Sequence, residues 1–172
     1  MIGVPRNKVI LSEYDKGWEK VFEEEKRKIL NICGDNIMTI EHIGSTSIPG
    51  LIAKPIIDIA LTFDNKEKRD KIIESIVSLS YEFIQETDVI DRLFFVKRIN
   101  RDSYYHIHGY PQDSVNYTNQ ILFRDYLRNH KEIAEEYAQL KKDLYRRYKD
   151  NRSEYTAGKS NFIKNLLKII TK

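Results

Sequence analysis

Residues 41–59 read EHIGSTSIPGLIAKPIIDI. Apolar and β-branched residues lead up to Ile43, small residues follow from Gly44 to Gly50, and the apolar run Pro55–Phe63 comes next. This order predicts a strand, a tight turn and a second, well-buried strand. Glycine lets a ligand approach the backbone closely, and successive N–H groups together with Ser and Thr hydroxyls can donate to an anion. The turn from Gly44 to Ser47 is therefore suited to an anion such as phosphate; the alternative is that it only caps the N-terminus of a helix.

An acidic residue, Asp58, stands in the middle of the second predicted strand, between Ile57 and Ile59. An unpaired carboxylate in such apolar surroundings would cost several kcal/mol, so it needs a partner. A divalent cation shared with a bound triphosphate is one such partner. A nearby Lys or Arg is the other. Lys54, just before the strand, is either that partner or a contact to phosphate.

Two histidines, His106 and His108, are two residues apart on the predicted strand Tyr104–Tyr110. Alternate side chains of a strand project to one face, so both imidazoles could bind the same cation. If this strand lies beside that of Asp58, a mixed carboxylate and imidazole site follows. Such nitrogen-rich sites favour Zn²⁺, Mn²⁺ or Ni²⁺ over Mg²⁺. The alternative is that both histidines bind a ligand phosphate or pack beneath helices.

Two arginines, Arg124 and Arg128, are four residues apart on a predicted helix and therefore share one of its faces. A pair of guanidinium groups suits a triphosphate or a carboxylate. The competing interpretation is pairing within the chain, for example with Asp125 or Glu132.

The remaining pattern predicts an α+β domain, a mixed sheet of four or five strands covered by helices with a C-terminal helical segment. The expected elements are a helix from Asp15 to Ile32, a strand Asn36–Ile43, a helix Lys66–Leu79, strands Tyr81–Gln85, Leu93–Ile99 and Tyr104–Tyr110, and three helical pieces from Val115 onward. In the second of these pieces the basic residues Lys141, Lys142, Arg146 and Arg147 are expected mostly to face solvent.

Composition limits the class of protein. With 172 residues, 41% of them hydrophobic, the chain is long enough for one domain, residues 1–172. A single cysteine, no signal-peptide pattern and no apolar run near the length of a bilayer span indicate a cytoplasmic protein without membrane partners. The net charge is +3, and residues 124–172 carry 13 Lys and Arg against 7 Asp and Glu. Nucleic acid is not an expected partner, because several of the tyrosines occupy predicted core positions.

Taken as a whole, the string from Glu41 to Ile59 resembles the signature of the GrpB family. The resemblance extends to Tyr14 and Trp18, to the His106–His108 segment, to residues 123–128, and to Tyr137, Lys141, Tyr155 and Lys159. It covers nearly the entire chain. The family is assigned to the nucleotidyltransferase fold superfamily, and it is similar to an accessory domain fused to some dephospho-CoA kinases.

The resemblance implies a nucleotide-binding protein that transfers a nucleoside monophosphate from an NTP to a small acceptor. Members of the superfamily carry Gly-Ser and, on a following strand, Asp, any residue, then Asp or Glu. Gly44, Ser45 and Asp58 match this pattern, but Ala60 stands where the second acid is expected, so one metal ligand is missing.

On this resemblance Ser45 and Asp58 would act in catalysis, and Asp58, His106 and His108 would hold a divalent ion, Mg²⁺ or Mn²⁺, with Zn²⁺ as the alternative. Residues expected to bind the nucleotide are Gly44, Ser45, Thr46, Ser47, Lys54, Arg124 and Arg128. The rival hypothesis is a non-catalytic accessory module that keeps the fold and assists a partner enzyme. The sequence leaves the oligomeric state open.

Overall fold

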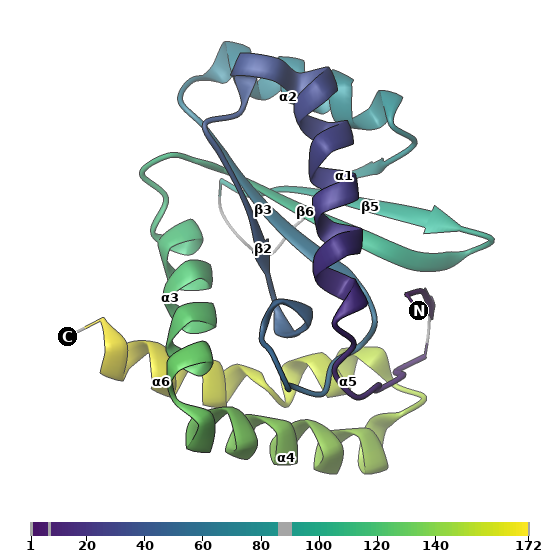
Figure 1. Cartoon of the computed structure of the whole chain (residues 1–172), viewed down its shortest axis with the longest axis vertical. Coiled ribbons are helices and arrows are strands. Elements are labelled where there is room, and N and C mark those ends of the chain that lie inside the picture. Colours follow the sequence, from purple (N-terminus) through teal and green to yellow (C-terminus); the bar gives the residue numbers. More distant parts are fainter. Residues whose placement is uncertain (1, 7, 86–90, 172) are drawn as a thin grey trace.

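A mixed β-sheet forms the centre of the computed structural model, which describes residues 2–6, 8–85 and 91–171 (Figure 1). In this part of the chain the sheet has six strands, in the order β2-β3-β6-β5-β4, with β1 paired to β6. The strands are β1 Val4–Pro5, β2 Thr39–Ile43, β3 Ile57–Phe63, β4 Glu82–Ile84, β5 Leu93–Ile99 and β6 Asp102–Pro111. Among these described strands only β3 and β6 pair in parallel, and their register sets Asp58 beside His106.

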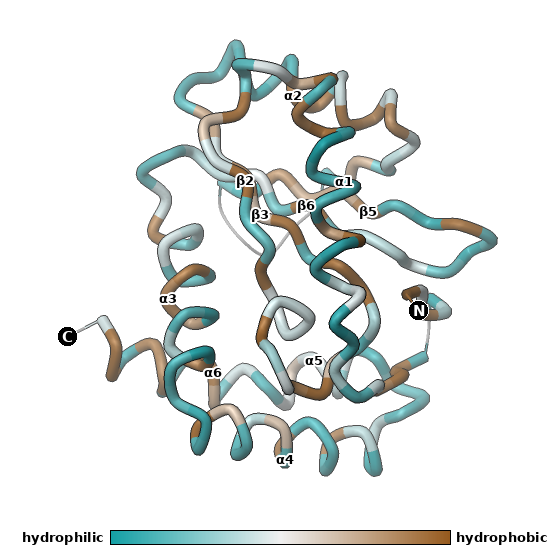
Figure 2. The backbone as a smooth tube through the Cα atoms, viewed as in Figure 1, coloured by the Kyte–Doolittle hydropathy of each residue, from teal (hydrophilic) through white to brown (hydrophobic). Residues whose placement is uncertain are grey.

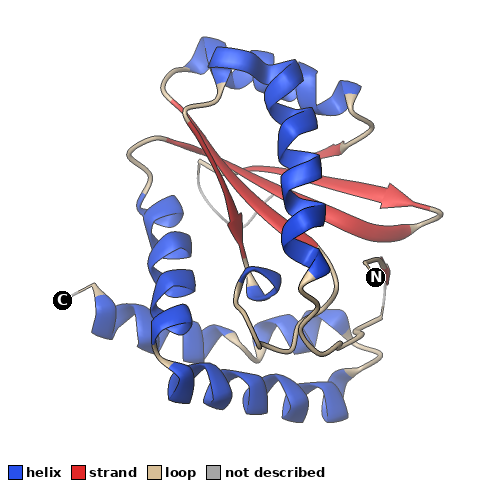
Figure 3. Ribbon diagram, in the orientation of Figure 1, coloured by secondary structure: helices blue, strands red, loops and turns tan. Residues whose placement is uncertain are grey.

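Helices cover the sheet and extend beyond it (Figure 3). They are α1 Gly17–Cys33, α2 Lys66–Ser78, α3 Val115–Asn129, α4 Lys131–Tyr148, α5 Arg152–Ala157 and α6 Ser160–Ile170, with 3-10 turns at Gly34–Asn36 and Ser45–Ser47. Along α1 and α3, hydrophilic and hydrophobic positions alternate as the helix turns (Figure 2). Each helix therefore has one apolar side to bury.

The side chains of β3 point alternately to the two faces of the sheet, and this determines which residues enter the main core. Its odd-numbered residues pack with Trp18 and Phe22 of α1 and Ile72 of α2 in the main hydrophobic core; they are Ile57, Ile59, Leu61 and Phe63. Successive side chains of a strand point to opposite faces. Asp58 therefore points away from α1 and α2, toward the side where the C-terminal helices lie.

The C-terminal helices have a core of their own. Leu127 of α3, Tyr137 of α4 and Leu166 of α6 pack together with Ile48 and Leu51, which follow the 3-10 turn at Ser45–Ser47. This second core attaches the helical layer to one end of the sheet. The space between the two layers holds the candidate site.

The expected α+β class, the helix Lys66–Leu79 and the strand Leu93–Ile99 agree with the structure. The helical tail has four pieces, because α4 ends at Tyr148 and the Asn151 side chain caps α5 by accepting from the N–H of Glu154, 3.2 Å away. Asp58 is the second residue of β3 and not its middle, so its side chain is 28% exposed. No helix in residues 2–6, 8–85 or 91–171 is long and apolar enough to cross a lipid bilayer.

A buried ion-pair network ties α1 to the edge of the sheet. Glu25 of α1 is completely buried, and its two carboxylate oxygens accept from Lys28, Tyr81 and Lys97 at 2.8, 3.0 and 2.8 Å. Burial alone would raise the pKa of Glu25, but its contacts with the two lysines lower it. The carboxylate is thus a charged structural anchor on the face of the sheet opposite Asp58.

Candidate functional site

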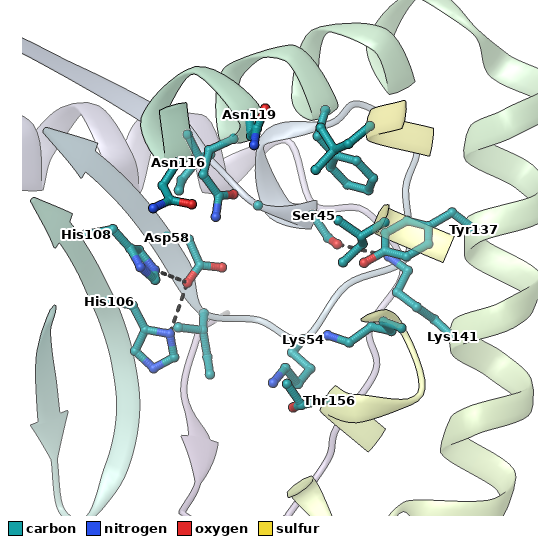
Figure 4. Close-up of a pocket in the computed structure, with 18 of the residues that line it drawn as sticks. Ser45, Lys54, Asp58, His106, His108, Asn116, Asn119, Tyr137, Lys141 and Thr156 are labelled. Atoms are coloured by element: carbon teal, nitrogen blue, oxygen red, sulfur yellow. Dashed lines mark hydrogen bonds and ion pairs between the residues drawn. The ribbon is translucent and has the colours of Figure 1, made fainter. Parts of the chain in front are cut away.

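Asp58, His106 and His108 form one cluster on the face of the sheet turned toward the C-terminal helices (Figure 4). Nδ1 of His106 lies 3.0 Å from Oδ1 of Asp58, and Nε2 of His108 lies 3.8 Å from the same oxygen. The parallel pairing of β3 with β6 brings them together, because Asp58 pairs with His106 and Ala60 with His108. The predicted common face of the two histidines is confirmed.

The charge state of the cluster suits a cation. Burial alone would raise the pKa of Asp58, but the two histidines hold it well below its usual value, so the carboxylate is ionised. Burial lowers the pKa of His106 despite the hydrogen bond to Asp58, which leaves its imidazole neutral. One potential ligand atom from each of Asp58, His106 and His108 lies within 4.8 Å of the others. A carboxylate with two imidazoles is a donor set that fits Zn²⁺ or Mn²⁺ better than Mg²⁺.

The glycine turn lies directly against this cluster. Gly44 has φ 69° and ψ −175°, a conformation that favours glycine. A Cβ atom added to Gly44 would lie 2.5 Å from Oδ2 of Asp58. The turn and the carboxylate therefore face each other, as the sequence predicts, and the missing side chain leaves room for the acid.

Gly44→Ala is expected to weaken Mn²⁺ binding at the cluster by about tenfold or more, because the new methyl group pushes the Asp58 carboxylate out of place. Gly50→Ala is a matched control. Gly50 also has a positive φ, 78°, so an alanine is strained there too, but an added Cβ meets nothing within 4 Å. Mn²⁺ titrations of both variants measure the difference. Equal loss in the two variants would mean that backbone strain, and not contact with Asp58, is responsible.

A cavity of about 570 Å³ opens in front of the cluster. Figure 4 shows Asp58, His106 and His108 on the sheet side and Tyr137 and Lys141 on the opposite side. Asn116, Asn119 and Gln120 of α3 line one wall, and Lys54, Arg152 and Lys159 line another. The cavity is thus walled by the sheet, the glycine turn and all four C-terminal helices.

The lysines of this cavity have unusual surroundings. Burial and the charges of Lys159 and Arg152 lower the pKa of Lys54 to about 7. Burial, opposed by Asp58 and assisted by Arg152, lowers the pKa of Lys159 to about 8. Burial and the charge of Lys159 place the pKa of Lys141 well below its usual value. An anion in the cavity would favour the charged form of each lysine.

The residues expected to bind nucleotide divide into two groups. Gly44, Ser45 and Lys54 line the large cavity with Asp58. Thr46, Ser47, Arg124 and Arg128 line a separate cavity of about 230 Å³ instead. The structure therefore does not bring all seven residues to one cavity.

Hydrogen bonds within the turn explain why two of its hydroxyls are unavailable. Oγ1 of Thr46 donates to the carbonyl of Ile56 at 3.2 Å and lies 3.0 Å from Nε2 of His42. Oγ of Ser47 donates to the carbonyl of Gly44 at 2.6 Å. These side chains shape the turn, and Ser45 alone points its hydroxyl into the large cavity, where Lys141 donates to it at 3.1 Å.

The two arginines hold the backbone on the far side of the turn. Arg124 pairs with Glu41 and Asp125, each at 2.7 Å, and donates to the carbonyl of His42 at 2.9 Å. Arg128 donates twice to the carbonyl of Ser47, at 3.0 and 2.8 Å. Pairing within the chain, the competing interpretation, is thus what the structure shows. Both arginines fix the two ends of the turn.

Of the four basic residues expected mostly to face solvent, Lys142, Arg146 and Arg147 are exposed, and Lys141 is the exception. It is 2% exposed, whereas its neighbour Lys142 faces solvent. Lys141 follows Tyr137 by four residues and precedes Leu144 by three, so it lies on the apolar face of α4. That spacing was the available signal. Arg152 and the α3 amides Asn116, Asn119 and Gln120 had no comparable signal.

Sequence comparisons find relatives along almost the whole chain. UPF0157 protein YqkA of Bacillus subtilis is 38% identical over 160 residues, which are 93% of this chain and 46% of that protein. The glutamate-rich protein GrpB of Alkalihalophilus pseudofirmus is 30% identical over 97% of this chain and 98% of its own length. A dephospho-CoA kinase of Mycobacterium bovis is 25% identical over 79% of this chain and 40% of the kinase. The chain thus spans nearly all of one relative and less than half of the other two.

Solved structures show the same relation. The crystal structure of the conserved protein GrpB from Enterococcus faecalis superposes with a TM-score of 0.86 at 34% identity, over 94% of this chain and 96% of that one. The Cid1 poly(U) polymerase with Mg 3'-dATP bound superposes with a TM-score of 0.54 at 13% identity, over 88% of this chain and 49% of that one. The second likeness is one of fold, and it confirms the expected nucleotidyltransferase-like architecture.

The family model described as GrpB protein matches residues 8–169, which include every strand from β2 onward, all six α-helices except the last residue of α6, and the whole candidate site. The curated relatives and the Enterococcus structure agree with this match. The chain belongs to the GrpB family.

Proposed function

We propose that this protein binds a nucleoside triphosphate and a divalent metal ion in the large cavity and transfers a nucleoside monophosphate to a small acceptor. The observation that carries the proposal is the cluster of Asp58, His106 and His108, which lies against the Gly44–Ser45 turn in a cavity lined by cationic side chains. The nucleotidyltransferase-like fold supports the reaction class. The metal ion and the nucleotide are each inferred from the residues present.

In this proposal Asp58, His106 and His108 hold the metal ion, preferably Mn²⁺ or Zn²⁺. When bound, the ion would supply Lewis-acid stabilisation of charge on the transferred phosphoryl group. Backbone N–H groups at Gly44 and Ser45 would donate to phosphate oxygens. Ser45 is oriented by the Lys141 ammonium, which donates to its hydroxyl. Lys54 would neutralise charge that grows on departing pyrophosphate.

A second candidate function is a non-catalytic accessory module that retains the nucleotide cavity. Ala60 favours it, because it pairs with His108 in the sheet and offers no metal ligand. Among the described residues the cluster at Asp58 is the one group of three or more His, Cys, Asp or Glu that could hold an ion. The match to part of a longer dephospho-CoA kinase is consistent with such a module.

The test combines binding and turnover. We expect NTP with Mn²⁺, at about 100 times its dissociation constant, to add ~2.7 kcal/mol of stability in thermal unfolding. Incubation with each NTP, a panel of small hydroxyl and amine acceptors, and Mn²⁺, Zn²⁺ or Mg²⁺ should release pyrophosphate. Metal-dependent NTP binding without any pyrophosphate would favour the accessory module. No stabilisation by any NTP would contradict both functions.

A further inference from the structure

Four cationic side chains converge on the large cavity from separate elements. Lys54 precedes β3, Lys141 belongs to α4, Arg152 begins α5, and Lys159 lies between α5 and α6. Among the residues that the structure describes, none of the four forms an ion pair with a carboxylate, and Asp58 is the one acidic residue lining the cavity. The cavity thus gathers four basic side chains against one acidic residue, and the positive charge that they carry is not balanced by the fold itself.

The partners that these cations do have are neutral. Nζ of Lys141 donates to Oγ of Ser45 and to the carbonyl of Ile52, and it lies 4.7 Å from the centre of the Tyr137 ring. Nζ of Lys54 and Nζ of Lys159 lie 5.6 and 4.9 Å from the centre of the Tyr155 ring. Aromatic faces and carbonyls attract a cation but do not cancel its charge.

Holding these groups together destabilises the free protein. Buried charges without counter-charges are costly, and like charges raise that cost. The lowered pKa values of Lys54 and Lys159 express the same cost. Helix surfaces elsewhere accommodate lysines such as Lys142 and Lys164 in solvent. A cluster of basic side chains that destabilises the free protein points to an anionic ligand, which would supply the negative charge that the cavity lacks.

We infer, building on the proposed function, that Lys54, Lys141, Arg152 and Lys159 bind the phosphate chain directly and select ligands with three or more negative phosphate charges. Four cations against the single carboxylate of Asp58 leave a surplus that orthophosphate or a nucleoside monophosphate cannot match. A triphosphate can. Since Ala60 contributes no ligand for a further cation, the side-chain cluster supplies neutralisation that one metal ion alone would leave incomplete.

The experiment measures binding without metal. Calorimetric titrations in EDTA should show affinity rising from orthophosphate to pyrophosphate to inorganic tripolyphosphate, and likewise from AMP to ADP to ATP, by about tenfold or more over each series. Lys159→Met should weaken tripolyphosphate binding by about tenfold or more, because a charge-assisted hydrogen bond is lost. The same variant should unfold at an equal or higher temperature than the unmodified protein, because a partly buried cation that is repelled by its neighbours has been removed.

Matched controls remove the same charge outside the cavity. Lys164→Met on α6 and Lys142→Met on α4 replace exposed lysines and should leave tripolyphosphate affinity within about twofold, as expected for screened surface charges. Lys54→Met is a second test of the cluster if Lys159→Met fails to fold. Undiminished tripolyphosphate affinity in the folded cavity variant, or orthophosphate binding as tight as tripolyphosphate, would overturn the inference.

The outcomes also separate this inference from the proposed function. In one outcome tripolyphosphate binding depends on the cavity lysines, but no divalent metal affects NTP binding. This outcome supports the cation cluster and contradicts metal-dependent transfer. In the other outcome pyrophosphate release depends on metal, but the lysine substitutions do not change the affinity for phosphate. This outcome supports the proposed transfer and contradicts the inference about the lysines.

Discussion

Asp58→Asn is expected to lower the affinity for Mn²⁺ by about 100-fold or more and to remove the part of NTP binding that depends on metal. The carboxylate is the one charged ligand in the cluster, and the two imidazoles contribute no negative charge when they bind a cation. An amide in its place keeps an oxygen but loses the charge that attracts the ion. Calorimetric or spectroscopic titration with Mn²⁺, in the presence and absence of NTP, measures both effects.

The variant should still fold. The oxygen of the new amide group can accept from Nδ1 of His106, as the carboxylate oxygen of Asp58 now does at 3.0 Å. Asp64→Asn is the control, because Asp64 follows β3 at its other end and pairs with Lys68 on the surface. The Asp64→Asn change should leave the affinity for Mn²⁺ unchanged.

If Asp58→Asn bound Mn²⁺ as tightly as the unmodified protein, the cluster would not be the metal site.

Glu25→Ala is expected to lower the free energy of unfolding by about 3–5 kcal/mol, the largest stability effect that the fold suggests. Removing the buried carboxylate leaves the Lys97 ammonium and the Tyr81 hydroxyl without their acceptor. The side chain of Lys97 is only 17% exposed, so water replaces the lost contact poorly. Urea unfolding followed by circular dichroism measures the loss.

Two comparisons define the cause of that loss. Glu24→Ala removes an exposed carboxylate one residue earlier and should change stability by about 0.5 kcal/mol or less.

The contribution of Glu25 to stability should also depend on pH. Because the folded state lowers the pKa of Glu25 below its ordinary value of 4.5, the contribution is present above pH 4.5 and is lost as the pH falls further. A difference between Glu25→Ala and the unmodified protein that persists unchanged into strong acid would argue against the ion pairs.

Local patterns were enough for most of the secondary structure. The apolar run up to Phe63, the helical spacing of Ile72 and Ile76, and the glycine at the turn each reflect physics that acts within a few residues. The structure differs from the sequence prediction where contacts with distant residues determine an element. The short strand β1, for example, exists because Val4 pairs with Ser103, almost a hundred residues away.

The cluster of Asp58, His106 and His108 was also within reach of sequence. The spacing of His106 and His108 sets both imidazoles on one face, and a charged residue in an apolar run such as Asp58 needs a partner. The sequence did not show whether the strand of Asp58 and the strand of the two histidines are neighbours in the sheet. The parallel pairing of β3 with β6 makes them neighbours.

The sequence by itself determined most of the helices and strands, the glycine turn and the common face of His106 and His108. Only the tertiary structure decided which cations reach the cavity. Arg124 and Lys141 are both long side chains on amphipathic helices, yet the first is turned to the back of the turn and the second into the cavity. Periodicity shows that side chains share a helix face, but what that face covers depends on how the helices pack against the sheet.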